Sequence, residues 1–212
     1  MIVERKEESM TFEELVNGLY DRRILLSEEN INDSCVGRLR MQFIQLNLRD
    51  SRTPIRFYID TRYGDVDEAL SLVSTMGTID APIIGLVDGK CDAYGLALLQ
   101  SCGIRLSTPF ARFKLQRISS SSSFCYNGTN ISEKFTKLGA HLELMQEKLD
   151  RVIMGKREGR ELRGLHLREY YDEQKVFFGE DAPTLGFVDE VVGKGIWEGE
   201  HIVLPSKIGF QQ

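Results

Sequence analysis

Only three histidines occur in this chain of 212 residues, so any mechanism that uses an imidazole base depends on one of them. They are His141, His166 and His201. An imidazole acts in nucleophilic catalysis when it contacts a hydroxyl or thiol and is itself oriented by a third group. An isolated histidine usually lies on the surface or is partly packed, and we expect this of all three.

A run of five serines, Ser119–Ser123, is the second group that could carry chemistry. A catalytic serine–lysine dyad would need a lysine and an oxyanion site beside this run, and the sequence positions neither. We therefore expect the low-complexity segment from Ser119 to Asn130 to be a mobile loop.

The cysteines form no CxxC pair and have no zinc-like spacing with the histidines. Each lies near apolar neighbours, which favours buried free thiols over metal ligands or disulfides. The sequence thus predicts neither a metal site nor a bound cofactor. The four are Cys35, Cys91, Cys102 and Cys125.

The composition is that of an ordinary globular chain, with 42% hydrophobic and 28% charged residues. It excludes a disordered tail, a collagen-like rod and a small disulfide scaffold. The net charge is −5 and no long basic stretch occurs, so a nucleic-acid binder is not favoured. The amino terminus has no apolar core like that of a signal peptide, and no apolar run is long enough to span a membrane. We expect a protein of a soluble, reducing compartment.

Segments typical of strands and helices alternate along the chain, which predicts an α/β core without internal sequence repeats. Apolar residues from Phe135 to Val152 recur at spacings of three and four, which predicts a long helix over 132–155 with a seam for a partner helix. A cap at Asn32 predicts a helix that follows it. The other expected elements are strands over 54–59, 83–87, 104–106, 113–115 and 186–192, and helices over 65–76, 96–101 and 165–171.

The order of these elements, together with four short motifs, resembles the Clp protease proteolytic subunit (ClpP) family over roughly residues 18–192. The resemblance implies a ClpP/crotonase-like α/β fold of repeated β-β-α units with a protruding handle helix. It also divides the chain into an axial-loop-like segment at 1–22, a ClpP-like domain at 23–192 with a handle region at about 116–160, and an extension at 193–212. The motifs are Tyr58-Ile-Asp-Thr-Arg-Tyr-Gly-Asp-Val66, Gly89-Lys-Cys-Asp-Ala-Tyr-Gly95, Pro109-Phe-Ala-Arg112 and Gly186-Phe-Val-Asp189.

All three catalytic positions that the resemblance implies carry residues that cannot do the chemistry. The nucleophile position falls on Ala93, the general-base position on Gln116 and the orienting-acid position on Gln174. A methyl group cannot attack a carbonyl, and a glutamine does not act as a base near neutral pH. We therefore expect no catalytic residue in this chain.

An oxyanion site consists of backbone N–H groups and can persist without the catalytic side chains. The resemblance places its two donors at Gly64 and Tyr94. Carboxylates at Asp65 and Asp92 would oppose negative charge there. Asp92 is either a new acid or base or a solvated or capping residue, and the second role is favoured because no activated nucleophile accompanies it.

The resemblance further implies seven-membered rings that stack in pairs, and an AAA+ Clp unfoldase that docks on their outer face. Here the docking positions are Arg56 and Tyr58, and an arginine where an aromatic residue is usual predicts weakened docking. The leading hypothesis is a ClpR-like, non-catalytic structural or regulatory subunit that assembles with active ClpP-type subunits for ATP-dependent degradation of unfolded proteins. The compartment would be a bacterial cytoplasm or the plastid stroma.

Two alternatives stay open. A crotonase-like acyl-CoA enzyme would use the oxyanion donors at Gly64 and Tyr94 with Asp92 or Asp65 as acid or base. A scaffold ring would assemble without a protease partner.

Overall fold

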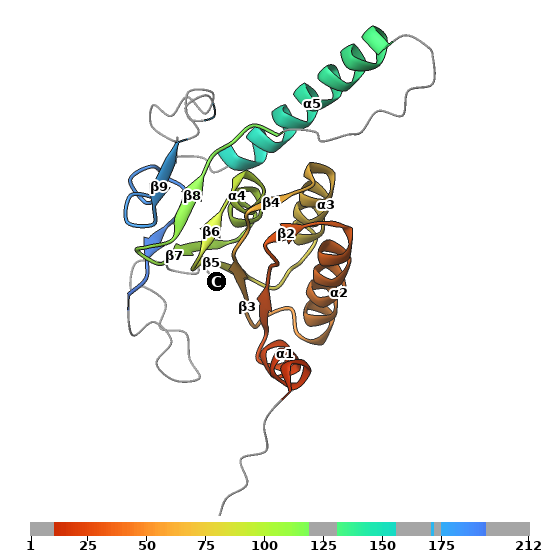
Figure 1. Ribbon diagram of the computed structural model, residues 1–212. Helices are drawn as coiled ribbons and strands as arrows, with labels where there is room; N and C mark the ends of the chain where they lie inside the picture. Colours follow the sequence, from red (N-terminus) through yellow and green to blue (C-terminus); the bar gives the residue numbers. More distant parts are fainter. Residues whose placement is uncertain (1–10, 119–130, 156–170, 172–174, 194–212) are drawn as a thin grey trace, which may run out of the picture.

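A five-stranded parallel sheet forms the centre of the protein (Figure 1). The computed structural model describes residues 11–118, 131–155, 171 and 175–193. Each strand pairs in parallel with its neighbours, so the connections between them must cross over the sheet. The strand order is β1 (Ile24–Leu26), β3 (Ile55–Ile59), β5 (Ile83–Val87), β7 (Ile104–Ser107) and β10 (Glu190–Val191).

A second, short strand follows each of the first four strands of this sheet, and a helix comes next. This arrangement confirms the expected α/β fold of repeated β-β-α units. The short strands build two small sheets, one with the order β2-β4 and one with the order β6-β8-β9, in which β8 and β9 are antiparallel. The short strands are β2 (Asn30–Ile31), β4 (Tyr63–Gly64), β6 (Lys90–Cys91), β8 (Arg112–Lys114) and β9 (Val176–Phe178), and the helices are α2 (Asp33–Arg49), α3 (Val66–Met76), α4 (Ala93–Gln100) and α5 (Ile131–Met154).

Polar side chains at the strand–helix junctions decide where three of these helices begin. The side chains of Asn32, Asp65 and Asp92 accept hydrogen bonds from backbone N–H groups in the first turns of α2, α3 and α4. Such caps satisfy donors that have no partner within the helix. The cap predicted at Asn32 is confirmed, whereas α4 begins at Ala93 rather than at Leu96 because Asp92 caps it.

The main core lies between the sheet and the helices. Ile83 and Val87 of β5 belong to it, and a Cβ atom on Gly85 would contact Leu99 and Cys102 at the end of α4. The rings of Phe43 in α2 and Phe57 in β3 pack edge to face, with centroids 5.3 Å apart. Because side chains alternate along a strand, Ile84 and Leu86 point to the opposite face of the sheet.

The long helix predicted over 132–155 is confirmed as α5, which projects beyond the rest of the protein (Figure 1). Only the base of its apolar stripe is deeply packed, where Leu149 and Ile153 join the main core. Leu138, Leu142 and Met145 remain half-buried. The outer part of α5 therefore retains apolar surface that the described residues do not cover fully.

A buried ion pair joins β7 to the segment before β10. Arg105 Nη2 donates to Asp189 Oδ1 at 2.8 Å, and the two side chains are 4% and 8% exposed. Gly186 precedes this pair with a φ of +78°, a backbone region that suits glycine. This turn explains why the strand predicted over 186–192 is wrong in length, since only Glu190–Val191 pairs with β7.

The helix α1 (Phe12–Asp21) lies within the segment expected to be axial-loop-like, and a capping box of Thr11 and Glu14 starts it. Cys35, Cys91 and Cys102 are buried free thiols, as predicted. No helix among the described residues is long and apolar enough to cross a membrane. The first ten residues, Cys125 with the whole 119–130 segment, most of the helix expected over 165–171, and residues 194–212 lie outside the described ranges.

Candidate functional site

The N-terminus of α4 is the point where the expected nucleophile position lies. Ala93 is the first residue of this helix and is 1% exposed. Its side chain is a methyl group with neither a lone pair nor a proton to transfer. The backbone turn that would present a nucleophile is therefore present, but the side chain can only pack.

The Asp92 side chain beside it is buried, at 3% exposure, and serves as the cap of α4. Its Oδ1 accepts a hydrogen bond from Thr61 Oγ1 at 2.8 Å and another from the Gly95 N–H at 2.9 Å. Its Oδ2 is also buried and has no hydrogen-bond partner among the described residues. The capping role expected for Asp92 is confirmed, but the side chain is not solvated.

Burial raises the pKa of the Asp92 carboxyl, because a charge is costly where water is excluded. The backbone N–H groups of Gly95 and Tyr94 and the Thr61 hydroxyl offset part of this rise. The Tyr94 N–H, one of the two expected oxyanion donors, therefore faces a carboxylate of the protein itself. A second anion would meet repulsion at this point.

Gly64, the other expected oxyanion donor, lies in β4. The N–H groups of its neighbours Tyr63 and Asp65 donate to Glu29 O and Ile31 O on the β2 side. Because N–H directions alternate along a strand, the Gly64 N–H points away from β2. A Cβ atom at Gly64 would lie 2.8 Å from Ile31 Cβ, so only glycine fits here without a shift.

Asp65 directs its carboxylate into the first turn of α3, where Oδ1 accepts hydrogen bonds from the N–H groups of Asp67 and Glu68. Its charge still reaches the site. Burial, followed by the charges of Asp92 and Asp65, raises the pKa of the Tyr94 hydroxyl to about 12. The charges of Asp92 and Asp65 thus both act on the Tyr94 side chain.

The β6-β8-β9 sheet brings the expected base position close to the nucleophile position. Cys91 of β6 pairs in parallel with Phe113 of β8, so the carboxyl ends of these two strands lie at the same edge. Ala93 follows β6 by two residues, and Gln116 follows β8 by two residues. Gln116 is half-buried. Gln174 lies outside the described residues.

A cavity of about 160 Å³ opens beside Asp92. The thiol among its described lining residues, Cys91, is a poor candidate nucleophile, because burial and then the charges of Asp92 and Asp60 raise its pKa well above the ordinary value. Cationic side chains dominate the remainder of the lining. The lining residues are Thr61, Arg62, Lys90, Cys91, Asp92, Arg112 and Lys114.

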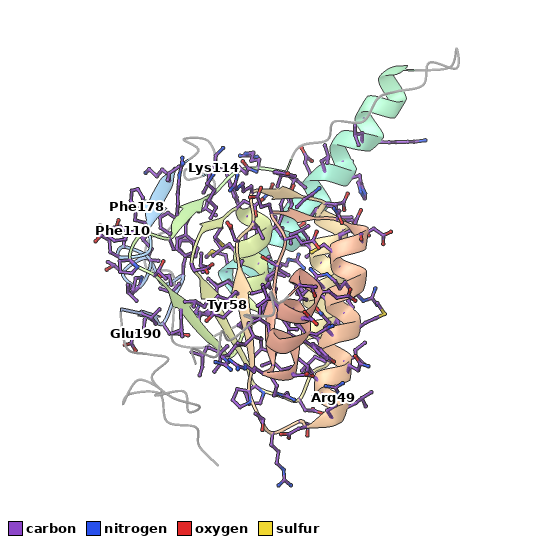
Figure 2. All side chains as sticks on the ribbon, turned by 60° about the horizontal axis from the view of Figure 1, so that its bottom comes forward. Arg49, Tyr58, Phe110, Lys114, Phe178 and Glu190 are labelled. Atoms are coloured by element: carbon purple, nitrogen blue, oxygen red, sulfur yellow. The ribbon has the colours of Figure 1, made fainter. Side chains whose placement is uncertain are left out.

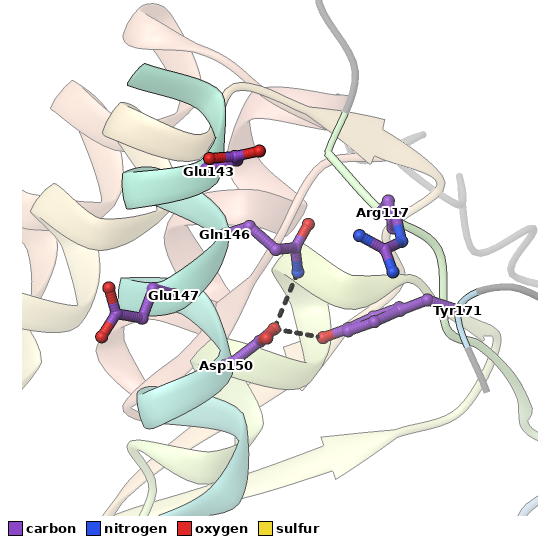
Figure 3. A pocket seen from close by; sticks show the side chains of 6 residues that line it. All are labelled: Arg117, Glu143, Gln146, Glu147, Asp150 and Tyr171. Carbon is purple, nitrogen blue, oxygen red and sulfur yellow. Dashed lines mark hydrogen bonds between the residues drawn. The ribbon is translucent and has the colours of Figure 1, made fainter. Parts of the chain in front are cut away.

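A larger cavity, of about 470 Å³, lies at the base of α5 (Figure 3). Its walls are polar: Asp150 Oδ1 accepts hydrogen bonds from the Tyr171 hydroxyl at 2.6 Å and from Gln146 Nε2 at 2.7 Å. Burial and the contact with Asp150 raise the pKa of Tyr171, which therefore stays protonated and donates. The lining residues are Arg117, Glu143, Gln146, Glu147, Asp150 and Tyr171.

The expected docking residues Arg56 and Tyr58 lie on one face of β3, between buried neighbours. Arg56 Nη2 donates to Arg22 O at 3.0 Å. His141 is exposed on α5, as expected, whereas His166 and His201 lie outside the described ranges. Sequence reasoning misses Thr61 as a site residue, because its contact with Asp92 joins positions 31 apart in sequence and no local pattern marks it.

The repeated β-β-α units and the projecting helix define a ClpP-type fold. The family model described as Clp protease matches residues 5–195. The chain belongs to the Clp protease family.

Relatives in three bacteria are similar to this chain at low identity over most of its length. ATP-dependent Clp protease proteolytic subunit 2 of Bifidobacterium longum is 24% identical over 180 residues, which cover 84% of this chain and 83% of the relative. Proteolytic subunit 3 of Streptomyces coelicolor is 26% identical, with 84% and 79% covered. The proteolytic subunit of Streptococcus pyogenes serotype M5 is 21% identical, with 91% and 95% covered. The chain is therefore a divergent member of the family.

Proposed function

We propose that this protein is a non-catalytic, ClpR-like subunit of an ATP-dependent Clp protease complex. The observation that carries the proposal is Ala93, a buried methyl group at the first position of α4, where the resemblance expects the nucleophile. Asp92 directly before it supports the proposal, since a buried carboxylate opposes an oxyanion.

The register of the small sheet adds support for the vacant base position. Phe113 pairs with Phe177, and Lys114 with Val176. The Leu115 N–H donates to Lys175 O, which extends this antiparallel ladder by one residue. Gln116 follows this ladder directly and is half-buried, so an amide without a basic nitrogen occupies the expected base position.

We propose that the subunit is part of a hetero-oligomer. The relatives are named as proteolytic subunits of ATP-dependent Clp proteases, which supports a place in such a complex. The resemblance to the family further implies assembly with active ClpP-type subunits, in seven-membered rings stacked in pairs. An AAA+ Clp unfoldase would deliver the substrates, which are unfolded proteins. The assembled barrel would lie in a bacterial cytoplasm or the plastid stroma, and this subunit would contribute architecture and asymmetry.

Docking of the unfoldase at Arg56 and Tyr58 would be weaker at this subunit. Arg56 is held by the carbonyl of Arg22, and it brings a charge to a position that an apolar contact would need. Tyr58 is half-buried and packs against the apolar face of the sheet. Neither side chain offers a fully accessible apolar surface.

Labelling with a fluorophosphonate probe tests the proposal. The purified protein should remain unlabelled, while an active serine-bearing ClpP subunit, treated in parallel, should be labelled. Labelling of this chain that is absent from a heat-denatured sample would overturn the proposal, because it would reveal an activated serine.

The crotonase-like alternative is less favoured, since the Tyr94 N–H already faces the Asp92 carboxylate. An increase in melting temperature with acyl-CoA would favour it. A scaffold ring without a protease partner is distinguished by co-purification, because the proposal requires an active paralogue in the same complex.

A further inference from the structure

Six apolar side chains form a continuous surface on the face of the central sheet that points away from α4. Five of them are only 1–5% exposed, and Tyr58 is half-buried against them. Figure 2 labels Tyr58, which lies on β3, and Glu190, which lies on β10; β5 and β7 lie between these two strands in the sheet. We call it the apolar outer face, and its residues are Tyr58, Ile84, Leu86, Ile104, Leu106 and Val192.

These residues cannot bury one another to this degree. Side chains on one face of a sheet stand side by side, about 4.8 Å apart between strands, so neighbours cover their flanks and not their tips. The described members of the cluster come from β3, β5, β7 and the residue after β10, and no described helix contributes a side chain to it. Another layer must therefore lie over this face.

The chain itself continues from the edge of this face. Val192 belongs to the cluster, and residues 193–212 follow it directly. The Clp protease match ends at residue 195, so almost all of this segment lies beyond the family's common part. The segment is rich in large apolar side chains: Ile196, Trp197, Ile202, Val203, Leu204, Ile208 and Phe210.

The length of the segment is sufficient. Crossing from β10 over β7 and β5 to β3 spans three inter-strand spacings, or about 14 Å. An extended chain covers about 3.3 Å per residue, so about five residues reach Tyr58 and the others can pack along the strands. An apolar segment tethered at the rim of an apolar face has a high effective concentration there, which favours it over a separate partner.

We propose that residues 194–212 fold back within the same chain and cover the apolar outer face. The segment thereby takes part of the surface on which Tyr58 lies. If this protein is the Clp subunit proposed above, the subunit occupies its own docking surface and leaves the unfoldase to its paralogues. Only this consequence rests on the proposed function.

Photo-crosslinking from position 197, which holds the only tryptophan, tests the contact. The Trp197→p-benzoylphenylalanine variant of the full chain is irradiated, and its crosslinked peptides are identified by mass spectrometry. We expect crosslinks to the peptides of β5 and β7. A matched probe at Leu144, an exposed position on α5, should give none to those strands. Crosslinks from 197 that avoid the apolar outer face would overturn the proposal.

An isotope-mixing experiment distinguishes crosslinks within one chain from crosslinks between two chains. In a sample that combines ¹⁵N-labelled and unlabelled protein, crosslinks within one chain join peptides of the same isotope, and this is the expected result. Mixed-isotope crosslinks would show that the segment covers a neighbouring subunit, which also overturns the proposal.

A truncated chain that ends at Gly193 provides a second readout. We expect it to bind a dye specific for exposed apolar surface at least several-fold more than the full chain. A full-length Trp197→Ser/Val203→Ser variant should also bind more dye than the unsubstituted full chain. The control variant Lys207→Ser/Gln211→Ser should bind as much dye as the unsubstituted full chain. Equal dye binding by the folded truncated and full-length chains would contradict the proposal. Fluorophosphonate labelling of the protein would overturn the proposed function and leave these results unchanged.

Discussion

The Thr61 hydroxyl donates a hydrogen bond of 2.8 Å to Asp92 Oδ1 and thereby joins the turn after β3 to the N-terminus of α4. Thr61 is completely buried, and Asp92 is nearly so. The Asp92 N–H in turn donates to Thr61 Oγ1 at 3.3 Å. This reciprocal contact joins the two turns next to the expected oxyanion positions, and it sets a carboxyl group beside the Tyr94 N–H.

Asp92→Asn should make the protein more stable at neutral pH. The folded-state pKa of Asp92 is raised above its ordinary value of 3.8 by burial, so its ionisation disfavours the folded state. The stability of the wild type relative to Asp92→Asn is therefore highest below pH 3.8 and decreases as the pH rises through the raised pKa of Asp92. The asparagine can retain the contacts with Thr61 and Gly95.

Urea unfolding of both proteins from acidic to neutral pH measures this difference. The advantage of Asp92→Asn should grow as the pH rises. Asp92→Ala provides the contrast, because it loses the cap and leaves Thr61 unpaired, at a cost of about 1–3 kcal/mol. An advantage of the asparagine variant that is constant with pH would show that Asp92 is not buried as a carboxylate.

Ala93→Ser should not restore peptidase activity. The serine would lie at the correct position, but Gln116 has no basic nitrogen to accept its proton. A fluorogenic peptide assay and fluorophosphonate labelling of the variant provide the measurement, with an active ClpP subunit as the positive control. A measurable rate would show that another group acts as the base and that the assignment of Gln116 is wrong.

Gly95→Ala should destabilise the protein, although alanine favours helices. A Cβ atom at position 95 would overlap Thr61 Oγ1 and approach Cys91 Sγ to 3.2 Å. Overpacking of this kind costs about 1–3 kcal/mol. Gly37→Ala is the matched control, because that glycine also lies in a helix but a Cβ atom added to it would meet no other atom within 4 Å.

The control should be stabilised by about 0.5–1 kcal/mol, since glycine costs that much in a helix interior. Thermal unfolding followed by circular dichroism measures both variants. If both melted at higher temperature than the wild type, the close approach of α4 to Thr61 would be refuted.

Arg105→Met should cost about 3–5 kcal/mol, because it leaves the buried Asp189 carboxylate without its cation. The loss should appear as a lower urea midpoint. The exposed pair of Arg151 and Glu147 on α5 is the control, and Arg151→Ala should change stability by less than about 1 kcal/mol. Equal effects of the two substitutions would mean that the Arg105 pair is solvated in solution.

Much of the fold could be predicted from the sequence, because local patterns carry it. The apolar run Ile83–Val87, the cap at Asn32 and the stripe on α5 each depend on neighbouring residues alone, and the structure confirms them. The start predicted for α4 is wrong, since the helix begins at Ala93. For Asp92 the sequence favours a solvated or capping role, and only its contact with Thr61 shows that the cap is buried.

The sequence by itself determined which side chains stand at the positions where the resemblance expects a nucleophile and a base. Ala93 and Gln116 have no nucleophilic or basic atom in any conformation, and no fold can supply one. The tertiary structure decided what surrounds these positions. It brought Thr61 into contact with Asp92 and Arg105 into contact with Asp189. It also buried one apolar face of the central sheet more deeply than the strands alone can bury it. Such contacts join residues that are distant in the chain, and the exclusion of water that gives them their strength exists only after folding.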